Sequence, residues 1–367
     1  MQHVENNPDF ESLNVNKGIE QPPMVNPNLA NSIHKKKSYS VVDYVEGIRK
    51  GNRTVLSQAV TLIESALPEH HAIAQEVIEK CLPYSGNSVR IGITGVPGAG
   101  KSTFIEALGM YIVNQNKQLA VLAIDPSSER SKGSILGDKT RMEDLSVHKN
   151  AFIRPSPSAG SLGGVARKTR ETIVLCEAAG FNNIFIETVG VGQSEIAVHS
   201  MVDFFLLLQI TGAGDDLQGI KRGIMEMADG IVINKADGNN LEKAILAKNQ
   251  YKNALALFPQ HESQWKPQVL TCSAFYKENI AEVANMLQEY VTFTKDNRYF
   301  DYKRKKQAKY WMYETINDEL KGHFYNDTLI RKQLDQIEQQ VVQGEASPFA
   351  AAKKMLDLYF LNISKNK

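Results

Sequence analysis

Residues 88–103 read Ser-Val-Arg-Ile-Gly-Ile-Thr-Gly-Val-Pro-Gly-Ala-Gly-Lys-Ser-Thr, and this stretch decides the fold. Apolar residues alternate over positions 88–94, which predicts a β-strand. A glycine-rich turn follows, and Lys101 opens a segment that predicts a helix to about Asn114. A strand, a glycine-rich turn and a helix in this order predict a loop whose backbone wraps a phosphate chain.

The turn contains the full G-x-x-x-x-G-K-S pattern. Its glycines let several backbone N–H groups point inward, and the positive end of the following helix attracts phosphate. Lys101 is expected to reach the β- and γ-phosphates, Ser102 to bind Mg²⁺ and Thr103 to contact the α-phosphate. A chance glycine-rich turn is the alternative, and the flanking strand and helix disfavour it. The predicted phosphate contacts are Gly95, Val96, Pro97, Gly98, Ala99, Gly100, Lys101, Ser102 and Thr103.

Short apolar runs alternate with helical segments beyond this loop. We expect strands at residues 119–124, 151–153, 184–187, 204–210, 231–234 and 269–271. Alternation of this kind predicts right-handed crossovers and a mostly parallel sheet covered on both faces. The predicted fold is therefore α/β, with a three-layer P-loop NTPase core.

Four segments are expected along the chain. Residues 1–38 are a polar lead-in without periodicity, and residues 39–86 form a helical segment with two amphipathic helices broken at Gly51-Asn52. The P-loop core covers residues 87–292, and residues 293–367 form a helical C-terminal segment. The basic run at residues 303–306 in that last segment is interpreted as a solvated helix face.

The motif Asn234-Lys235-Ala236-Asp237 follows a predicted strand and indicates which base the nucleotide carries. The Asp237 carboxylate can accept hydrogen bonds from N1–H and the 2-amino group of guanine, and adenine offers neither donor there. The pattern therefore favours GTP over ATP, although a polar helix cap explains four such residues equally well when they are taken alone. Ser273, Ala274 and Phe275 follow the last strand, where a backbone contact to the base is expected.

Acidic residues stand at the ends of two further strands. Asp125 and Glu187 fall at carboxyl edges, where Mg²⁺ or a nucleophilic water can be held, or where each acid simply caps a helix. Glu187-Thr-Val-Gly190 resembles the second switch of GTPases, with Glu in place of the more usual Asp, and this resemblance implies that the N–H of Gly190 reaches the γ-phosphate. Asp138 lies in a polar, glycine-bearing stretch, and it is either a further Mg²⁺ ligand or a solvated loop acid.

Composition excludes several classes of function. Lys and Arg total 42 against 41 Asp and Glu, so the net charge of +1 gives no sign of a nucleic-acid partner. The three cysteines are scattered, which favours a reduced cytoplasmic setting and no bound transition metal. No apolar run approaches the roughly 18–20 residues that cross a membrane, and residues 1–33 resemble neither a secretory signal nor a transit peptide.

Taken together, the motifs resemble the methylmalonyl-CoA mutase-associated GTPases, a family with bacterial members and a mitochondrial counterpart linked to methylmalonic aciduria. The likeness extends from about Tyr44 to the C-terminal helices. It rests on the P-loop, Asp125-Pro-Ser-Ser, Gly133-Ser-Ile-Leu-Gly-Asp138, Arg154-Pro-Ser-Pro, Glu187-Thr-Val-Gly-Val-Gly-Gln-Ser194, Gly214-Asp-Asp-Leu-Gln-Gly-Ile-Lys221 and Asn234-Lys-Ala-Asp237.

The resemblance implies a homodimeric, Mg²⁺-dependent GTPase that forms GDP and phosphate and binds an adenosylcobalamin-dependent methylmalonyl-CoA mutase. It implies that the chain gates cofactor loading of that mutase and protects or reactivates it. Lys101, Glu187, Gln193 and Lys221 are the candidate catalytic residues, with Gln193 expected to orient water. The resemblance also implies a third mobile segment at residues 212–221, in which Lys221 or the paired Asp215 and Asp216 link nucleotide state to the mutase; an ordinary loop whose acids cap the next helix is the alternative. The C-terminal segment is the expected dimer or partner contact.

Two other enzymatic functions and one non-enzymatic function compete with this hypothesis. An ATP-dependent kinase of a transport binding protein is disfavoured by Asn234 and Asp237. A GTPase that inserts metal into urease or hydrogenase is disfavoured because the predicted switches carry no Cys or His ligands. A scaffold that binds nucleotide without hydrolysing it is the third alternative.

Overall fold

The computed structural model describes residues 39–65, 67–125, 142–157, 162–188, 194–211 and 222–365. The chain divides into a first unit, Met1–Ser40, and a second unit, Val41–Lys367. Every helix and strand described below belongs to the second unit. Asp138, Gly190, Gln193 and Lys221 lie outside the described residues, as does the side chain of Asp125.

A seven-stranded sheet with the order β3-β2-β4-β1-β5-β6-β7 forms the centre of the fold. All neighbouring strands run parallel, so the carboxyl ends of all seven lie along one edge of the sheet. The strands are β1 (Val89–Gly95), β2 (Leu119–Asp125), β3 (Ala151–Pro157), β4 (Asn183–Thr188), β5 (Phe204–Gln209), β6 (Gly230–Ile233) and β7 (Gln268–Thr271). Each of the seven predicted strands is present, and the predicted α/β class is confirmed.

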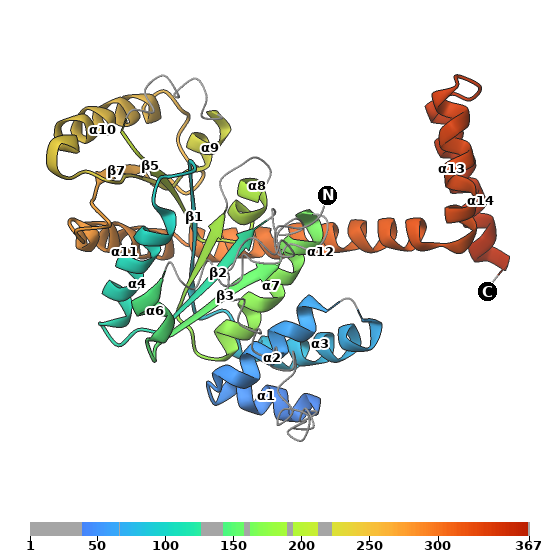
Figure 1. Cartoon of the computed structure of the whole chain (residues 1–367), viewed down its shortest axis with the longest axis horizontal. Helices are drawn as coiled ribbons and strands as arrows, with labels where there is room; N and C mark the ends of the chain where they lie inside the picture. Colours follow the sequence, from blue (N-terminus) through green and yellow to red (C-terminus); the bar gives the residue numbers. More distant parts are fainter. Residues whose placement is uncertain are drawn as a thin grey trace, which may run out of the picture. The chain divides into compact units, whose positions relative to one another are not determined.

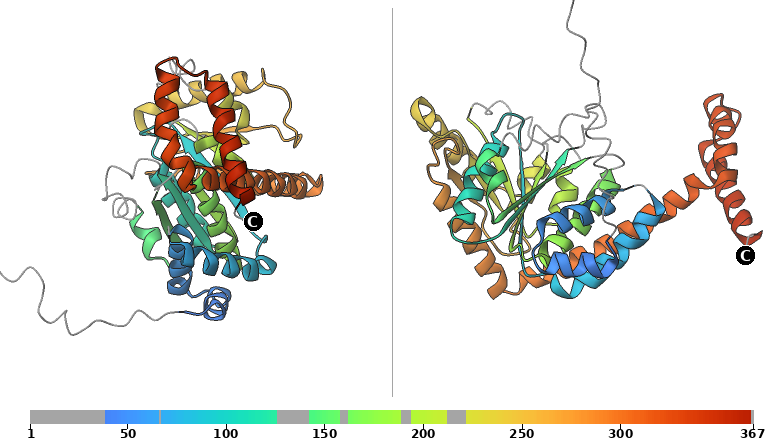
Figure 2. Two further views of the ribbon diagram at one scale, coloured as in Figure 1. Left: turned by 90° about the vertical axis from the view of Figure 1, so that its right-hand side faces the viewer. Right: turned by 60° about the horizontal axis from the view of Figure 1, so that its bottom comes forward.

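Helices cover both faces of this sheet, as Figures 1 and 2 show. The N-terminal helices are α1 (Val41–Arg49), α2 (Arg53–Glu64) and α3 (Pro68–Cys81). Those of the core are α4 (Lys101–Val113), α6 (Glu143–Val147), α7 (Leu162–Ala178), α8 (Ser194–His199), α9 (Arg222–Met227), α10 (Leu241–Leu255) and α11 (Ile280–Asp296). The C-terminal helices are α12 (Tyr299–Asn326), α13 (Thr328–Val342) and α14 (Pro348–Lys365). None of the described helices is long and apolar enough to cross a membrane.

The predicted break between the first two helices is confirmed at Gly51-Asn52. Gly51 takes a left-handed backbone with φ of 69°. The side chain of Asn52 accepts hydrogen bonds from the backbone N–H groups of Thr54 and Val55, and it thereby caps the start of α2.

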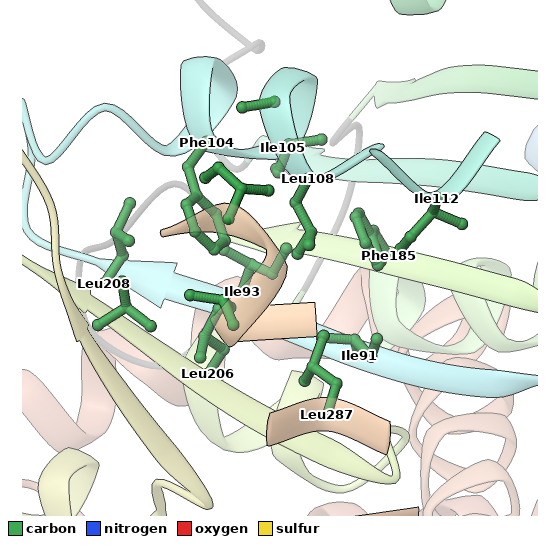
Figure 3. Close-up of a cluster of buried hydrophobic side chains, with 14 of the residues drawn as sticks. Ile91, Ile93, Phe104, Ile105, Leu108, Ile112, Phe185, Leu206, Leu208 and Leu287 are labelled. Carbon is green, nitrogen blue, oxygen red and sulfur yellow. The ribbon is translucent and has the colours of Figure 1, made fainter. Parts of the chain in front are cut away.

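The main hydrophobic cluster lies between α4, α11 and one face of the sheet. Figure 3 shows Phe104, Ile105, Leu108 and Ile112 of α4 beside strand residues such as Ile93. The opposite face of β1 is covered by α8: a Cβ built on Gly92 would lie 2.8 Å from the side chain of Val198. The sheet is therefore buried on both sides, which explains its nearly continuous apolar strands.

The first half of α12 is bound to the segment that joins α8 to β5. Arg304 donates from Nε and Nη2 to the two carboxylate oxygens of Asp203, at 2.8 and 2.7 Å. Lys303, Gln307 and Trp311 donate to the backbone carbonyls of Asp203, Val202 and Ser200. Lys303 is only 8% exposed, so the interpretation of residues 303–306 as a solvated face was wrong for its first half.

The C-terminal helices form a second, smaller cluster. Ile330 and Ile337 of α13 pack against Ala351, Met355 and Tyr359 of α14, and Phe324 at the end of α12 joins them. The break between α12 and α13 was not predicted. It is marked by Asp327, whose carboxylate accepts hydrogen bonds from the N–H groups of Leu329 and Ile330.

Candidate functional site

The predicted phosphate loop joins β1 to α4 at the carboxyl edge of the sheet. Two of its glycines are required by close approach of other groups. A Cβ on Gly95 would lie 2.2 Å from the carbonyl oxygen of Leu208, and one on Gly100 would lie 2.9 Å from the Asn234 amide nitrogen. Gly100 also has φ of 81°, a left-handed conformation that strains other residues. The loop therefore packs directly against β5 and against the Asn234 loop.

Lys101 is the first residue of α4 and folds back over the loop. Its ammonium donates to the carbonyl oxygen of Gly95 at 2.9 Å and lies 3.4 Å from that of Val96. Burial lowers the pKa of Lys101, and the nearby carboxylates of Glu187 and Glu195 act in the opposite direction. A partly desolvated ammonium at the open end of a phosphate loop can bind an anion strongly.

Ser102 and Glu187 meet beside Lys101. The Ser102 hydroxyl donates to Glu187 Oε1 at 3.3 Å. Glu187 lies near the end of β4, paired with Ile93 of β1, and the hydroxyl of the next residue, Thr188, donates to that of Thr94 at 2.8 Å. The strand pairing therefore brings a predicted carboxylate and a predicted hydroxyl ligand to one place.

These two oxygen groups have the chemistry that Mg²⁺ prefers, because hard divalent cations select carboxylate and hydroxyl oxygens. Asp125 ends β2, the strand next to β4, with Ile124 paired to Thr188. The backbone of the third predicted ligand is thus at the same sheet edge. In the described part of the chain, no group of three or more His, Cys, Asp or Glu side chains is arranged to hold a metal.

The Asn234 side chain links the two predicted nucleotide motifs. Its Nδ2 donates to the carbonyl oxygen of Ala99 in the phosphate loop at 2.8 Å. Its Oδ1 accepts from the backbone N–H of Ala274 at 3.0 Å and from the Cys272 thiol at 3.5 Å. Asn234 is 2% exposed, so its amide acts as an internal brace rather than as a surface cap.

Asp237 and Ser273 also lie together, as the base-site hypothesis requires. The Ser273 hydroxyl donates to Asp237 Oδ2 at 2.6 Å. No side-chain cap is formed by Asp237 at the short helix that follows it, Gly238–Asn240, which disfavours the alternative interpretation as a helix cap. Phe275 is 76% exposed, and the side chain of Lys235 is exposed as well.

Most of the described candidates thus gather at one edge of the sheet, from the ends of β1, β4, β6 and β7. Sequence reasoning missed Glu195, which is 2% exposed on α8 and acts on the pKa of Lys101. It also missed Asn240, whose side chain holds the Lys235 turn. A single polar residue after a motif carries no pattern, so only the folded chain identifies either one.

Comparisons with known proteins agree with this geometry. The family model described as "Methylmalonyl Co-A mutase-associated GTPase MeaB" matches residues 56–328. A probable GTPase of Mycobacterium tuberculosis is 48% identical over 320 residues, covering 86% of this chain and 95% of the relative. The mitochondrial methylmalonic aciduria type A homolog of Mus musculus is 44% identical over 323 residues, covering 85% and 78%.

One solved structure is similar over nearly the whole fold. The crystal structure of a LAO/AO transport system kinase superposes with a TM-score of 0.70 at 36% identity, and the match covers 87% of this chain and 97% of that one.

Proposed function

The chain belongs to the family of methylmalonyl Co-A mutase-associated GTPases, and we propose that it acts as a GTP-dependent chaperone of an adenosylcobalamin-dependent methylmalonyl-CoA mutase. The observation that carries the proposal is the family match over residues 56–328, which includes the phosphate loop, the Glu187 strand and the base loop. The similarity to a methylmalonic aciduria type A homolog supports the same partner. In this role the chain gates cofactor loading and protects or reactivates the mutase.

Phosphate binding is proposed for the loop between β1 and α4. Backbone N–H groups of the residues from Gly95 to Thr103, apart from Pro97, which has none, are proposed to face the phosphates, and the N-terminus of α4 adds its positive end. Lys101 exchanges its contacts with the Gly95 and Val96 carbonyls for phosphate oxygens. This exchange costs little, because the ammonium is already desolvated and held in the loop.

Mg²⁺ would be held beside this loop by Ser102 and Glu187 and, as the sequence predicts, by Asp125 and Asp138. The 3.3 Å contact between the Ser102 hydroxyl and the Glu187 carboxylate supports the assignment, because it shows two oxygen groups of the kind that Mg²⁺ prefers beside each other at the phosphate loop. When bound, the ion neutralises negative charge on the phosphates during attack by water. Gly190 and Gln193 are the proposed γ-phosphate and water contacts, and they lie outside the described residues.

Guanine recognition is proposed for the Asp237 carboxylate, with the Ser273–Phe275 loop beside it. The Ser273 hydroxyl fixes one carboxylate oxygen, and an acceptor-only group is thereby held at the position that faces the base. Adenine would leave this carboxylate without a hydrogen-bond donor, so the chain is expected to bind ATP roughly tenfold or more weakly than GTP. The kinase alternative, to which the similar LAO/AO transport system kinase corresponds, requires ATP to bind as well as GTP, and a nucleotide-competition titration distinguishes the two.

A route from the nucleotide to a partner is proposed through α8 and α12. Glu187 and α8 flank the residues that follow β4, and the segment after α8 is bound by Arg304, Gln307 and Trp311 of α12. The same helix continues without a break to Asn326. A change at the site that moves α8 is therefore transmitted to a helix whose second half offers partner contacts.

The C-terminal segment is proposed to form the contact of a homodimer. Apolar side chains stand exposed along the middle of α12: Tyr310, Met312, Tyr313, Ile316 and Leu320. Leu320 also lines a groove of about 770 Å³ between α12, α13 and α14, whose lining is largely apolar. Exposed apolar surface of this extent is typical of protein–protein contacts.

Light scattering coupled to gel filtration tests the dimer. Ile316→Asp is expected to give a monomer, because it places a charge in the middle of the apolar stripe. Asn317→Asp, which introduces the same charge at the exposed neighbouring residue, is expected to remain dimeric. Equal masses for the two variants contradict the assignment of this face.

Co-elution tests the mutase as partner. The purified chain, mixed with the methylmalonyl-CoA mutase of its source and either GDP or a non-hydrolysable GTP analogue, is expected to elute with the mutase and to change the elution profile between the two nucleotides. Separate elution in both states contradicts the proposal.

A further inference from the structure

Asn240 ends the short helix that follows the base motif, and it makes three contacts with its surroundings. Its Nδ2 donates to the carbonyl oxygen of Lys235 at 2.6 Å. Its Oδ1 accepts from the Thr211 hydroxyl at 2.6 Å. Its backbone N–H donates to the carbonyl oxygen of Asp237 at 2.9 Å. One residue therefore touches both Lys235 and Asp237.

The direction of the Asn240 amide is determined by its neighbours. A backbone carbonyl can only accept a hydrogen bond, so the nitrogen of the amide must face Lys235. The oxygen then faces Thr211, and the Thr211 hydroxyl must be the donor. The orientation of the amide thus follows from the donor and acceptor inventory alone, without a choice between two flipped forms.

The Lys235 turn needs such a support. Lys235 has φ of 58°, in the left-handed region that costs a residue with a side chain about 1 kcal/mol or more. The next residue is fixed to β7, since the N–H of Ala236 donates to the carbonyl oxygen of Cys272 at 3.0 Å. The carbonyl of Lys235 itself is the one that Asn240 holds.

The side-chain oxygen of Asn240 contacts the segment that follows β5. Thr211 lies two residues beyond that strand, and the strand itself is tied to the base motif by the Asn234 N–H, which donates to the carbonyl oxygen of Gln209 at 2.7 Å. The base loop is therefore fastened to β5 at its beginning through Asn234 and at its end through Asn240.

We propose that Asn240 is a positioning residue for guanine recognition, which fixes the Lys235 turn and the approach of Asp237 to the base, with Thr211 orienting its amide. The proposal rests on the proposed role of Asp237 as the guanine acceptor. The hydrogen bonds of Asn240 go to Thr211, Lys235 and Asp237 and none goes to the described residues of the phosphate loop, so its effect is expected on nucleotide affinity and not on the chemical step.

The adjacent asparagine provides a matched control. Asn239 is exposed, and its side chain makes no hydrogen bond to the described residues, whereas Asn240 uses both ends of its amide. Asn240→Ala is expected to raise the Kd for fluorescently labelled GDP about tenfold, the loss expected for two hydrogen bonds, and to raise the KM for GTP in proportion. The kcat at saturating GTP is expected to stay within about twofold. Asn239→Ala is expected to have the same Kd for GDP, KM for GTP and kcat as the unmodified chain.

Two substitutions at Thr211 test the orienting arm. Thr211→Val removes the hydroxyl at nearly constant volume and is expected to raise the Kd for GDP about threefold, because the Asn240 amide loses its donor. Thr211→Ser keeps the hydroxyl and is expected to restore the original affinity. Equal Kd values for the valine and serine variants overturn the role of Thr211.

Asp237→Ala, measured in the same titration, separates this inference from the proposed function. If Asp237→Ala raises the Kd for GDP and Asn240→Ala has the same Kd as Asn239→Ala, the positioning role of Asn240 is overturned while guanine recognition by Asp237 stands. If Asp237→Ala has no effect, the guanine assignment fails and the role of Asn240 fails with it. A fall in kcat at unchanged KM for Asn240→Ala indicates a loss of folded protein, and it also overturns the proposal.

Discussion

The side-chain amide of Asn234 donates to the carbonyl oxygen of Ala99 at 2.8 Å, which joins the base motif to the phosphate loop 135 residues earlier in the chain. The other end of the same amide accepts from the backbone of Ala274. The three segments that are proposed to bind the nucleotide are therefore joined in one hydrogen-bonded unit by the protein's own side chains. Such preorganisation reduces the entropy that binding costs.

Asn234→Ala is expected to lower the free energy of unfolding by about 2 kcal/mol, because it leaves the buried Ala99 carbonyl and Ala274 N–H without partners. It is also expected to weaken GDP binding at least tenfold, since the phosphate loop loses its hydrogen bond from Asn234. Urea unfolding and a fluorescence titration measure the two effects. Asn253→Ala, at an exposed asparagine of α10, serves as the control and should change neither.

Asp237→Asn is expected to change which base is preferred. The amide can no longer accept from both donors of guanine, but its NH₂ can donate to the 2-carbonyl of xanthine. GTP is therefore expected to bind at least tenfold more weakly and xanthosine triphosphate more tightly than to the unmodified chain. Parallel hydrolysis assays with both nucleotides measure this exchange, and an unaltered preference for GTP would remove Asp237 from the base site.

Glu177 on α7 provides a prediction for stability. Burial alone would raise the pKa of Glu177, but the Arg90 guanidinium, the Ser88 hydroxyl and the Gly86 N–H outweigh it and hold the pKa below its usual value. A carboxylate with a lowered folded-state pKa adds stability above its unfolded pKa of about 4.3, and this stability is lost as the pH falls through the folded-state value.

Glu177→Gln is therefore expected to destabilise the chain by about 3 kcal/mol at pH 7, because the Arg90 guanidinium loses its carboxylate partner. The difference from the unmodified chain is expected to shrink as the pH is lowered below about 4. Urea unfolding at a series of pH values measures the difference. A constant difference from pH 7 down to the acid end would contradict an ionised Glu177.

Arg304→Lys tests the contact between α12 and the core. Arg304 makes paired hydrogen bonds with Asp203 and also donates to the carbonyl oxygen of Ser88 at 2.6 Å. Lysine keeps the charge but cannot form the paired hydrogen bonds that the planar guanidinium makes with Asp203, so a loss of about 2 kcal/mol in the free energy of unfolding is expected. Lys305→Ala, at the exposed next residue, is expected to change it by less than about 0.5 kcal/mol.

The strands and the phosphate loop could be predicted from the sequence because their signals are local. Short apolar runs and a fixed glycine spacing need no knowledge of distant contacts, and all seven strands are present near their predicted positions. The helix break at Gly51-Asn52 is equally local, because a left-handed glycine and a capping asparagine act within a few residues.

The buried charges could not be predicted in this way. The run from Lys303 to Lys306 has the composition of a solvated face, and only the tertiary structure shows that Arg304 meets Asp203 while Lys306 stays exposed beside Glu262. Asn240 was missed for the same reason, since its partner Thr211 follows another strand. The predicted boundaries at residues 38, 86 and 292 stay predictions.

The rate of GTP hydrolysis, measured with and without an equimolar methylmalonyl-CoA mutase from the same source, is the decisive measurement for the proposed chaperone function. Lys101→Ala with the mutase provides the background, because its phosphate loop lacks the ammonium. We expect a slow rate for the chain alone and an increase of about tenfold or more when the mutase is added. The same rate in the presence and absence of the mutase would contradict the proposed function.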